Sequence, residues 1–429
     1  MTIQELAHAI SDGRLDERFR QLYGKTDRAL LRQRARYLSA AEHFSRLYPE
    51  CDNISIFSAP GRTEVGGNHT DHQHGCVLAA AVDLDVIALV HFHNEGVIRI
   101  KSEGHKPNEV DLSDLSPVPE EKGTSNAIIR GVAAKFAEMG VEIGGFNAYT
   151  TSDVLSGSGL SSSAAFENLI GTIIDRHYNN GAAGAIEIAK IGQFAENVYF
   201  GKASGLMDQM VSSVGGFVAI DFRNPADPEI SPVDFDFSGA GYSLCITDTK
   251  GSHSDLTDDY IAVPAEMKSV AKALGAEFLR DVDSDDFYRK IPELREVCSD
   301  RALLRAAHFF DENERVTLET EAISNGDLEE FFRLVNESGN SSAQLLQNLY
   351  SIKSPEKQQI PLAIMLSRRV LQGSGAVRVH GGGFAGTIQA FVPTYLAGHY
   401  ASELDLVFGE GSCHVLSIRP EGGTEITLG

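Results

Sequence analysis

Residues 156–165 read SGSGLSSSAA and stand between a predicted strand and a predicted helix. Gly157 and Gly159 allow the backbone to turn tightly and to approach a ligand, and the free N–H groups at the start of the following helix attract a phosphate. The serines at 161–163 add hydroxyl groups for phosphate oxygens or for Mg²⁺. The run contains no Lys, so it is not a Walker A loop. It predicts a phosphate-binding loop, and a Gly/Ser turn that only caps a helix is the alternative.

Hydrophobic periodicity predicts a mixture of helices and strands along the whole chain. Helices are expected within 3–48 and at 124–139, 161–178, 183–199, 259–274, 300–323, 327–348, 357–372 and 395–407. Strands are expected from residue 54 and at 77–92, 97–101, 146–152, 216–222, 243–248, 376–380, 387–392 and 413–418. Helices and strands do not alternate strictly, which favours an α+β fold over a doubly wound parallel sheet. An acidic connection with two prolines at 224–229 suggests two domains, 1–225 and 226–429.

A second motif, APGRTEVGGNHTDHQHG at 59–75, is read as a polar turn. It carries Arg62, Asn68, His69 and Asp71, side chains that can hold several hydroxyl groups of a small hydrophilic ligand. The histidines around Asp71 also suggest a metal site, but no pair has the i, i+4 spacing of a helix and a loop alone does not fix tetrahedral geometry. A solvated polar turn is the third reading.

Two further segments are singled out by their composition. HGGGFAGT at 380–387 has four glycines within six residues, more than a hairpin requires, so another backbone or a ligand is expected to come close. A tight hairpin alone is the simpler alternative. In GLMDQ at 205–209, Asp208 is a lone acid among apolar neighbours, either a capping or buried carboxylate or a functional one.

The charge balance excludes some classes of partner. The chain has 37 Lys and Arg against 60 Asp and Glu, a net charge of −23, which argues against nucleic acid and anionic membranes. No apolar run is long enough for a transmembrane helix, and the first twenty residues are acidic rather than signal-like. Five scattered cysteines without a CxxC pair fit a reducing compartment. We therefore expect a cytoplasmic protein without a membrane partner.

Taken in order, these motifs resemble the GHMP superfamily of small-molecule kinases, and within it the galactokinase branch. GRTEVGGNHTDHQ is similar to that branch's GRVNLIGEHTDY, and SGSGLSSSAA, GLMDQ and GGGFAG follow at the expected places. The resemblance implies a two-lobed fold, with an N-terminal ribosomal-S5-like α/β lobe and a C-terminal ferredoxin-like α+β lobe. It also implies a sugar 1-kinase that moves the γ-phosphoryl group of ATP, with Mg²⁺, onto the anomeric hydroxyl of galactose. Many relatives are monomers, and no sequence feature demands another state here.

The resemblance also implies residue roles. Asp208 would accept the proton of the sugar hydroxyl while Arg62 keeps it ionised. The sugar would be held by Asn68, His69, Asp71, Gly205 and Tyr260. ATP would be held by Gly157, Ser158, Gly159, Leu160, Ser161, Ser162, Ser163, Gly382 and Gly383, and Mg²⁺ by Ser163 and Glu196.

The sequence departs from the family pattern at the motif glutamate, where it has Asn68, and at the following tyrosine, where it has His72. The family glutamate binds the C6 hydroxyl of the sugar, and a neutral amide would also tolerate a C6 carboxylate. A uronic-acid kinase such as a galacturonokinase is therefore the alternative. A non-catalytic sugar sensor is the third hypothesis, which retention of Arg62, Asp208, Glu196 and Ser163 disfavours. The chain has no Trp, so the adenine-stacking Trp common in the family is also missing.

Overall fold

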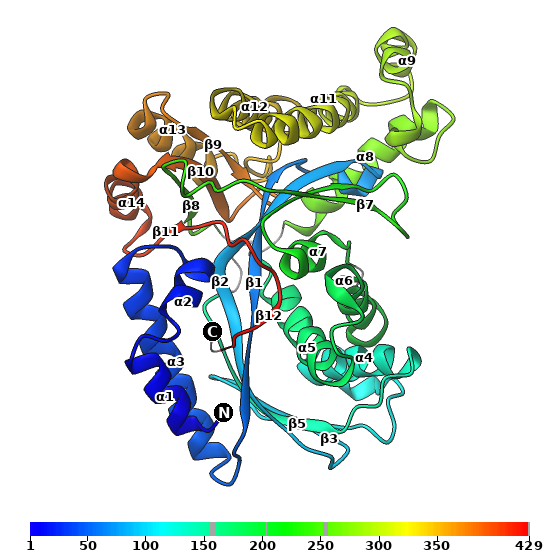
Figure 1. Cartoon of the computed structure of the whole chain (residues 1–429). Coiled ribbons are helices and arrows are strands. Elements are labelled where there is room, and N and C mark those ends of the chain that lie inside the picture. The colour runs from blue at the N-terminus through cyan, green and yellow to red at the C-terminus, as the bar shows by residue number, and fades with distance from the viewer. Residues whose placement is uncertain (155–159, 203, 252–255, 428–429) are drawn as a thin grey trace.

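The protein has two lobes, each built on its own β-sheet (Figure 1). The computed structural model describes residues 1–154, 160–202, 204–251 and 256–427. Gly157, Ser158 and Gly159 of the predicted phosphate loop lie outside these ranges. The helices and strands are mixed as predicted, and the α+β class is confirmed.

The larger sheet forms the first lobe, and within the described residues it has eight strands. Its main path runs β12-β1-β2-β5-β3-β4, while β6 pairs with β2, and β7 pairs with β6. All neighbours are antiparallel except β3 and β5, which are parallel. The strands are β1 (Ile54–Gly66), β2 (Cys76–Phe92), β3 (Val97–Ser102), β4 (Asn108–Asp111), β5 (Gly145–Ser152), β6 (Phe217–Asp221), β7 (Glu229–Val233) and β12 (Thr424–Glu425).

Helices cover both faces of this sheet (Figure 1). One face packs against α4 (Ser125–Glu138), α5 (Ser162–Tyr178) and α6 (Gly184–Phe194) with its π-helical extension η3 (Ala195–Phe200). The helix α7 (Met207–Val214) packs against Val77 and Ala79 of β2 and against Ala189 of α6. The other face packs against α1 (Ile3–Ser11), α2 (Asp16–Tyr23) and α3 (Asp27–Leu47). Along β2, Val86 and Ala88 face the first group while Ile87 and Leu89 face the second. Burial on both faces explains why 77–92 is an almost continuous apolar run.

The second lobe contains a smaller antiparallel sheet, with the order β11-β8-β10-β9 among the described strands. These strands are β8 (Tyr242–Asp248), β9 (Ala376–His380), β10 (Thr387–Pro393) and β11 (Cys413–Leu416). One face packs against α13 (Gln359–Leu371) and α14 (Thr394–Phe408). The remaining helices of this lobe are α8 (Thr257–Ala273), α9 (Ser284–Arg289), α10 (Ile291–Leu294), α11 (Asp300–Ser324) and α12 (Leu328–Ser341), which continues into η5 (Ser342–Leu346). Short 3₁₀ turns are η1 (Asp71–Gln73), η2 (Pro119–Glu121) and η4 (Leu279–Asp281).

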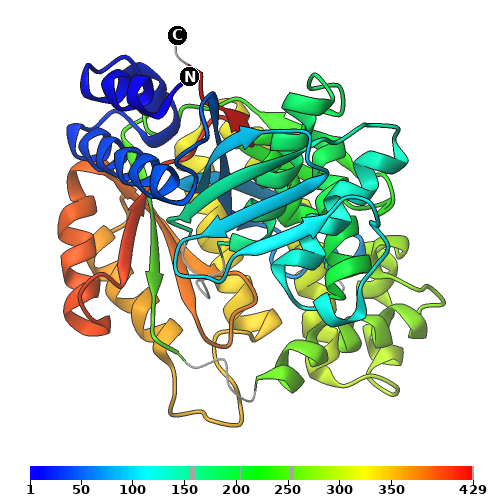
Figure 2. The ribbon, with the colours of Figure 1, turned by 90° about the horizontal axis from the view of Figure 1, so that it is seen from below.

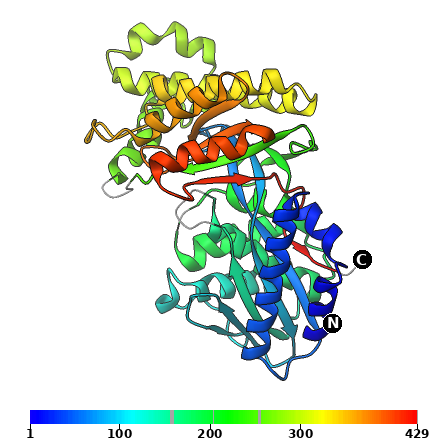
Figure 3. The ribbon, with the colours of Figure 1, turned by 90° about the vertical axis from the view of Figure 1, so that its left-hand side faces the viewer.

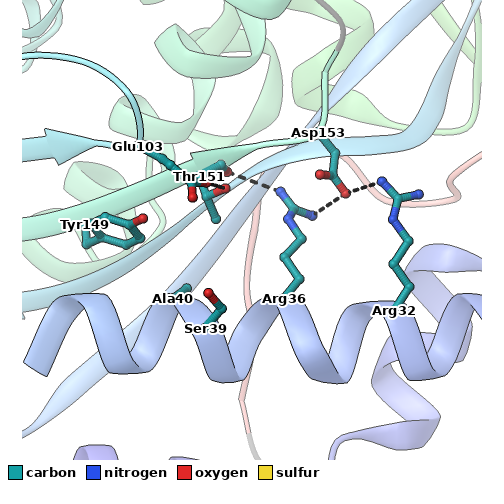
Figure 4. Close-up of a pocket in the computed structure, with 8 residues that line it drawn as sticks. All are labelled: Arg32, Arg36, Ser39, Ala40, Glu103, Tyr149, Thr151 and Asp153. Carbon is teal, nitrogen blue, oxygen red and sulfur yellow. Dashed lines mark hydrogen bonds and ion pairs between the residues drawn. The ribbon is translucent and has the colours of Figure 1, made fainter.

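A buried carboxylate fixes α3 to the larger sheet. Asp85 is fully buried and accepts hydrogen bonds from Arg36 Nη1 at 2.5 Å, from Tyr23 Oη at 2.6 Å and from Arg419 Nη1 at 3.0 Å. Arg36 also lies 3.4 Å from Asp153, which Arg32 reaches at 2.7 Å. Arg32, Arg36 and Asp153 line a polar cavity of about 250 Å³ between α3 and β5 (Figure 4).

The N-terminal helices and the last described strand lie side by side, as Figures 2 and 3 show from two directions. β12 pairs with β1 through Phe57 and Ser58, and Ile426 N donates to Ile56 O at 2.8 Å. Ile426 then packs among the side chains of α1 to α3. The polypeptide therefore enters the second lobe and returns to the first.

The predicted helices and strands are largely confirmed, but a turn expected in the second motif is wrong. Residues 59–61 do not form a turn, because β1 continues through them to Gly66 and bends at bulges between Pro60 and Arg62 and between Glu64 and Gly66. The predicted domain boundary at 225/226 stays a prediction. β7 lies just beyond it and still belongs to the larger sheet.

Candidate active site

A bulge in β1 brings the second motif against the end of the glycine and serine run. A Cβ atom on Gly61 would lie 2.8 Å from the carbonyl oxygen of Leu160, closer than real Cβ contacts. Arg62 N donates to the same carbonyl at 3.1 Å. Only glycine permits this approach, so the strand and the start of α5 form one continuous surface.

Arg62 and Asp208 form the central ion pair of this surface. Arg62 donates to Asp208 Oδ1 from Nε and from Nη2, both at 2.7 Å, and Ser161 Oγ donates to Oδ2. Burial acts to raise the pKa of Asp208, but the Arg62 charge and these hydrogen bonds outweigh it and hold the pKa below its usual range. Asp208 lies in the first turn of α7. The predicted catalytic pair is thus assembled, with Asp208 ionised and its side chain one-third exposed.

His69 presents a defined hydrogen-bond acceptor. Its Nε2 lies 3.0 Å from the carbonyl oxygen of Gly382, so Nε2 carries the proton and donates. Burial, with the charge of His72, lowers the pKa of His69 to about 4, so the ring is neutral at pH 7. Within the described residues Nδ1 has no hydrogen-bond partner. His69 also has φ 61°, a costly backbone conformation of the kind that clusters at functional sites.

Asn68 does not reach the same surface. It is fully buried, and its Nδ2 donates to Glu64 Oε1 at 2.9 Å and to Gly381 O at 2.7 Å. Its Oδ1 accepts from Asn348 Nδ2 at 2.9 Å. Glu64 is paired with Arg378 at 3.0 Å. Both ends of the Asn68 amide are therefore bonded to protein groups, and the structure does not bring it together with Asp208.

The glycine motif of the second lobe is held against the first lobe. Thr63 Oγ1 donates to Gln389 Oε1 at 2.5 Å and accepts from His380 Nε2 at 3.0 Å. Tyr260 Oη donates to Gly383 O at 2.8 Å, and a Cβ on Gly382 would lie 2.7 Å from the Tyr260 ring. The glycines therefore allow close packing of Tyr260, which is what their number predicts.

Asp71 and Gly205 lie next to each other. A Cβ on Gly205 would be 3.8 Å from Asp71 Oδ2, and the Asp71 side chain is about one-third exposed. The neighbouring His72 lies 3.7 Å from Asp71 Oδ1. Among the described residues no group of three or more His, Cys, Asp or Glu side chains is arranged to hold a metal ion, the histidines of this loop included.

A second acidic group lies beside α5. Glu196 is buried in η3, where its Oε1 accepts from Lys202 Nζ at 2.8 Å and its Oε2 from Gln209 Nε2 at 2.9 Å. Gln209 Nε2 also donates to Glu167 Oε2 at 2.9 Å. Burial and the nearby Glu196 raise the pKa of Glu167 to about 8. Ser163 is exposed in the first turn of α5.

Oxygen donors of this kind are what Mg²⁺ binds. The buried Glu196 carboxylate already holds one cation, Lys202, and within the described part of the chain Glu167 Oε1 has no partner. The side chains therefore fit a bound cation. Sequence reasoning identified Glu196 and Ser163 but missed Lys202, Glu167 and Gln209. Only the position of Gln209 beside Asp208 could have signalled a role.

Two family models match the chain. The galactokinase galactose-binding signature matches residues 42–92, and the GHMP kinases N terminal domain matches residues 126–216. The first includes the whole polar motif on β1 and η1. The second includes α5, Glu196 and Asp208.

Curated relatives named galactokinase are similar to this chain over most of their length. A galactokinase of Streptomyces coelicolor is 31% identical over 354 residues, which is 81% of this chain and 87% of the relative. A galactokinase of Actinobacillus pleuropneumoniae is 33% identical over 341 residues, 78% of this chain and 84% of the relative.

Solved structures share the fold. Lactococcus lactis galactokinase complexed with galactose superposes with a TM-score of 0.74 and 23% identity, covering 90% of this chain and 99% of that chain. A mevalonate kinase superposes with a TM-score of 0.59 and 15% identity, covering 85% and 98%. The predicted two-lobed GHMP kinase fold is thereby confirmed.

Proposed function

This chain belongs to the galactokinase family of GHMP kinases, and we propose that it transfers the γ-phosphoryl group of ATP to the anomeric hydroxyl of galactose. The observation that carries the proposal is the ionised Asp208 held by Arg62 and Ser161 at the start of α5. Phosphoryl transfer requires mainly positioning and charge neutralisation. Asp208 would receive the hydroxyl proton, and Arg62 would steady both the carboxylate and the transferring group.

We assign the sugar to the surface that contains Asp208, Asp71 and His69. His69 Nδ1 is an acceptor without a donor among the described residues, so a sugar hydroxyl would donate a hydrogen bond to it. Gly205 leaves room beside Asp71, and Tyr260 shapes this surface by fixing the glycine motif. Asn68 would act on the sugar through the position of His69 rather than by contact.

Galactose is favoured over a uronic acid by the surroundings of Asn68. A preference for a C6 carboxylate requires a neutral, open amide at this position, whereas the Asn68 amide is bonded at both ends. That amide donates to Glu64, which is itself paired with Arg378, so both groups are already occupied by protein partners.

For ATP, we propose that the segment from Gly157 to Ser163 binds the phosphates and that Gly382 and Gly383 approach them from the second lobe. Ser163 and Glu196 would hold Mg²⁺, which when bound supplies positive charge to the phosphoryl oxygens. Ser161 would have two roles. Its hydroxyl orients Asp208, and it stands at the N-cap position of α5, next to the proposed phosphate site.

The catalytic assignment is tested with Asp208→Asn. This variant keeps the shape of the side chain but cannot accept a proton, so we expect turnover to fall by roughly 10²- to 10⁴-fold with galactose affinity changed little. Turnover is measured by coupled ADP release, and affinity by calorimetry.

A matched control is Asp221→Asn. The pair of Asp221 with Arg280 has a distance of 2.5 Å and side-chain exposures of 30% and 11%, close to the 33% and 11% of Asp208 and Arg62. Asp221 lies on β6 outside the candidate site, so turnover should stay near normal. Near-normal turnover in Asp208→Asn would refute the assignment.

The sugar assignment is tested by measuring turnover on galactose, galacturonate, glucuronate and N-acetylgalactosamine in parallel. We expect galactose to give the highest kcat/KM. Turnover restricted to a uronic acid would overturn it. Sugar-induced stabilisation without turnover on any substrate would indicate a sensor instead.

A further inference from the structure

Lys202 is a lysine at the acidic group beside α5 that no sequence motif predicted. It follows the C-cap Gly201, which has φ 85° and ψ 28°. The backbone N–H of Lys202 donates to Glu196 O at 3.1 Å, which folds the residue back over the end of η3. Its Nζ then reaches Glu196 Oε1 at 2.8 Å. π-helical turns of this kind are frequent at functional sites.

The turn that carries Lys202 is packed firmly in place. Gly201 has a positive φ of 85°, a backbone conformation that favours glycine. Gly123 N donates to Phe200 O at 3.1 Å and ties the neighbouring loop to the same turn. The backbone of Lys202 is therefore positioned by its surroundings, although the side chain itself is 59% exposed.

The ammonium group of Lys202 is exposed and lies beside a group of buried carboxylates. Glu196 beneath it is 3% exposed, and Gln209 links Glu196 to Glu167. The charge of Lys202 also reaches Asp208, since it contributes, after Arg62 and Ser161, to the lowered pKa of that residue. Because Glu196 is buried, its carboxylate needs a positive partner, so Lys202 can leave it for a phosphate oxygen only where a bound cation takes its place.

The phosphate-binding run itself supplies no cation, because 156–165 contains no Lys or Arg. Arg62 is already engaged with Asp208 through two nitrogens. A nucleotide would bring several negative charges to a surface that is rich in carboxylates. An exposed ammonium group at its edge is the type of group that binds phosphate as a point charge.

We propose that Lys202 binds the phosphate chain of the nucleotide, exchanging Glu196 Oε1 for a phosphate oxygen. This inference rests on the proposed function and adds a residue to it. In the ligand-free protein Lys202 neutralises Glu196. With nucleotide bound, it neutralises phosphate charge and leaves Glu196 open to a cation.

The test is calorimetric titration with ADP and Mg²⁺ in the absence of sugar, so that turnover does not enter the measurement. In Lys202→Met the stem is kept and the charge is lost, so the ADP dissociation constant should rise roughly 10- to 100-fold, as expected for a hydrogen bond to a charged group. Lys202→Arg should retain most of the affinity. Galactose affinity should stay unchanged in both variants.

Lys190→Met is the matched control. Lys190 lies on the same helical segment and is paired with Asp227 at 2.9 Å, but that partner lies beyond β6 and away from Glu196. Unchanged ADP affinity in Lys202→Met, an equal loss in Lys190→Met, or a loss of thermal stability alone would overturn the proposal. ADP binding by the wild type without turnover on any sugar would overturn the proposed function and leave this inference standing, whereas absence of ADP binding would overturn both.

Discussion

At the scale of single residues, the carboxylate and the amide at positions 64 and 68 have changed places relative to the motif that the chain resembles. GRVNLIGEHTDY has Asn at the first of these positions and Glu at the second, and GRTEVGGNHTDHQ has the reverse. In the structure the two side chains are bonded to each other at 2.9 Å, and Arg378 neutralises Glu64. The exchange keeps one carboxylate and one amide in a buried pair, so the two substitutions depend on each other.

We predict that Asn68→Glu alone destabilises the protein by about 3 kcal/mol, because it buries a second carboxylate beside Glu64. The double variant Glu64→Asn/Asn68→Glu should recover at least half of that loss. Urea unfolding of the wild type, both single variants and the double variant gives the coupling energy. Strictly additive effects would contradict the exchange.

Side chains that lie together were predicted best where one motif contains them. Arg62, His69 and Asp71 stand in one stretch, and the structure places them on one surface with Asp208. Lys202 and Glu167 could not be found in this way, because their roles depend on the fold of η3 and on a bridging Gln209. Asn68 is the opposite case. It stands in a motif that indicates a site, but its side chain is buried and bonds to other protein groups.

At the scale of elements, α3 is held to the larger sheet by the charge on Asp85 as well as by apolar packing. Arg36 is 9% exposed and bonds to Asp85. It also donates to the carbonyl oxygen of Thr151 (Figure 4). Arg32 projects from the same helix to Asp153 but is 57% exposed. The two arginines therefore differ mainly in burial.

We predict that Arg36→Met destabilises the protein by about 3 kcal/mol, because it removes a buried partner of Asp85. Arg32→Met, the matched control, should cost less than about 1 kcal/mol, since its pair is exposed. Urea unfolding at pH 7 compares the two. Equal effects would mean that burial of the charge does not decide the anchoring of α3.

Elements with strong periodicity were predicted well, and the errors have physical causes. Pro60 and Gly61 indicate a turn by composition, but the strand continues through them. Pro60 still pairs with Asp85 of β2, and Gly61 leaves room for the Leu160 carbonyl. β12 spans only two residues and has no periodicity to detect. β7 contains a proline and lies in an acidic connection, so its sequence does not indicate a strand.

At the scale of the whole molecule, no helix among the described residues combines the length and apolar character that a bilayer-spanning segment needs.

The two lobes meet through buried polar groups. The lobe interface includes His380 at the end of β9, bonded to Thr63 of β1 and to Thr387 of β10. Burial, with the charges of Arg62 and Arg378, lowers the pKa of His380 from 6.5 to about 3.

This shift predicts a pH dependence of stability. The unfolded chain takes up a proton at this histidine as the pH falls below 6.5, while the folded protein does not until about pH 3. The stability that neutral His380 contributes above pH 6.5 is therefore lost as the pH falls, at up to about 1.4 kcal/mol per pH unit.

His380→Gln keeps two hydrogen-bonding groups and should reduce the loss of stability on acidification by that amount. His399→Gln, which changes an exposed histidine on α14, is the control and should retain the wild-type dependence. Unfolding free energies are compared at several pH values between 7 and 5. Identical slopes in the wild type and His380→Gln would refute the prediction.

The pairing of β12 with β1 has a consequence for synthesis of the protein. The partners Phe57 and Glu425 are separated by nearly the whole described chain, so β1 remains an unpaired edge until residue 425 has left the ribosome. Unpaired strand edges recruit other strands, and long-range pairing is slow to form. The larger sheet can therefore be completed only after translation of the second lobe.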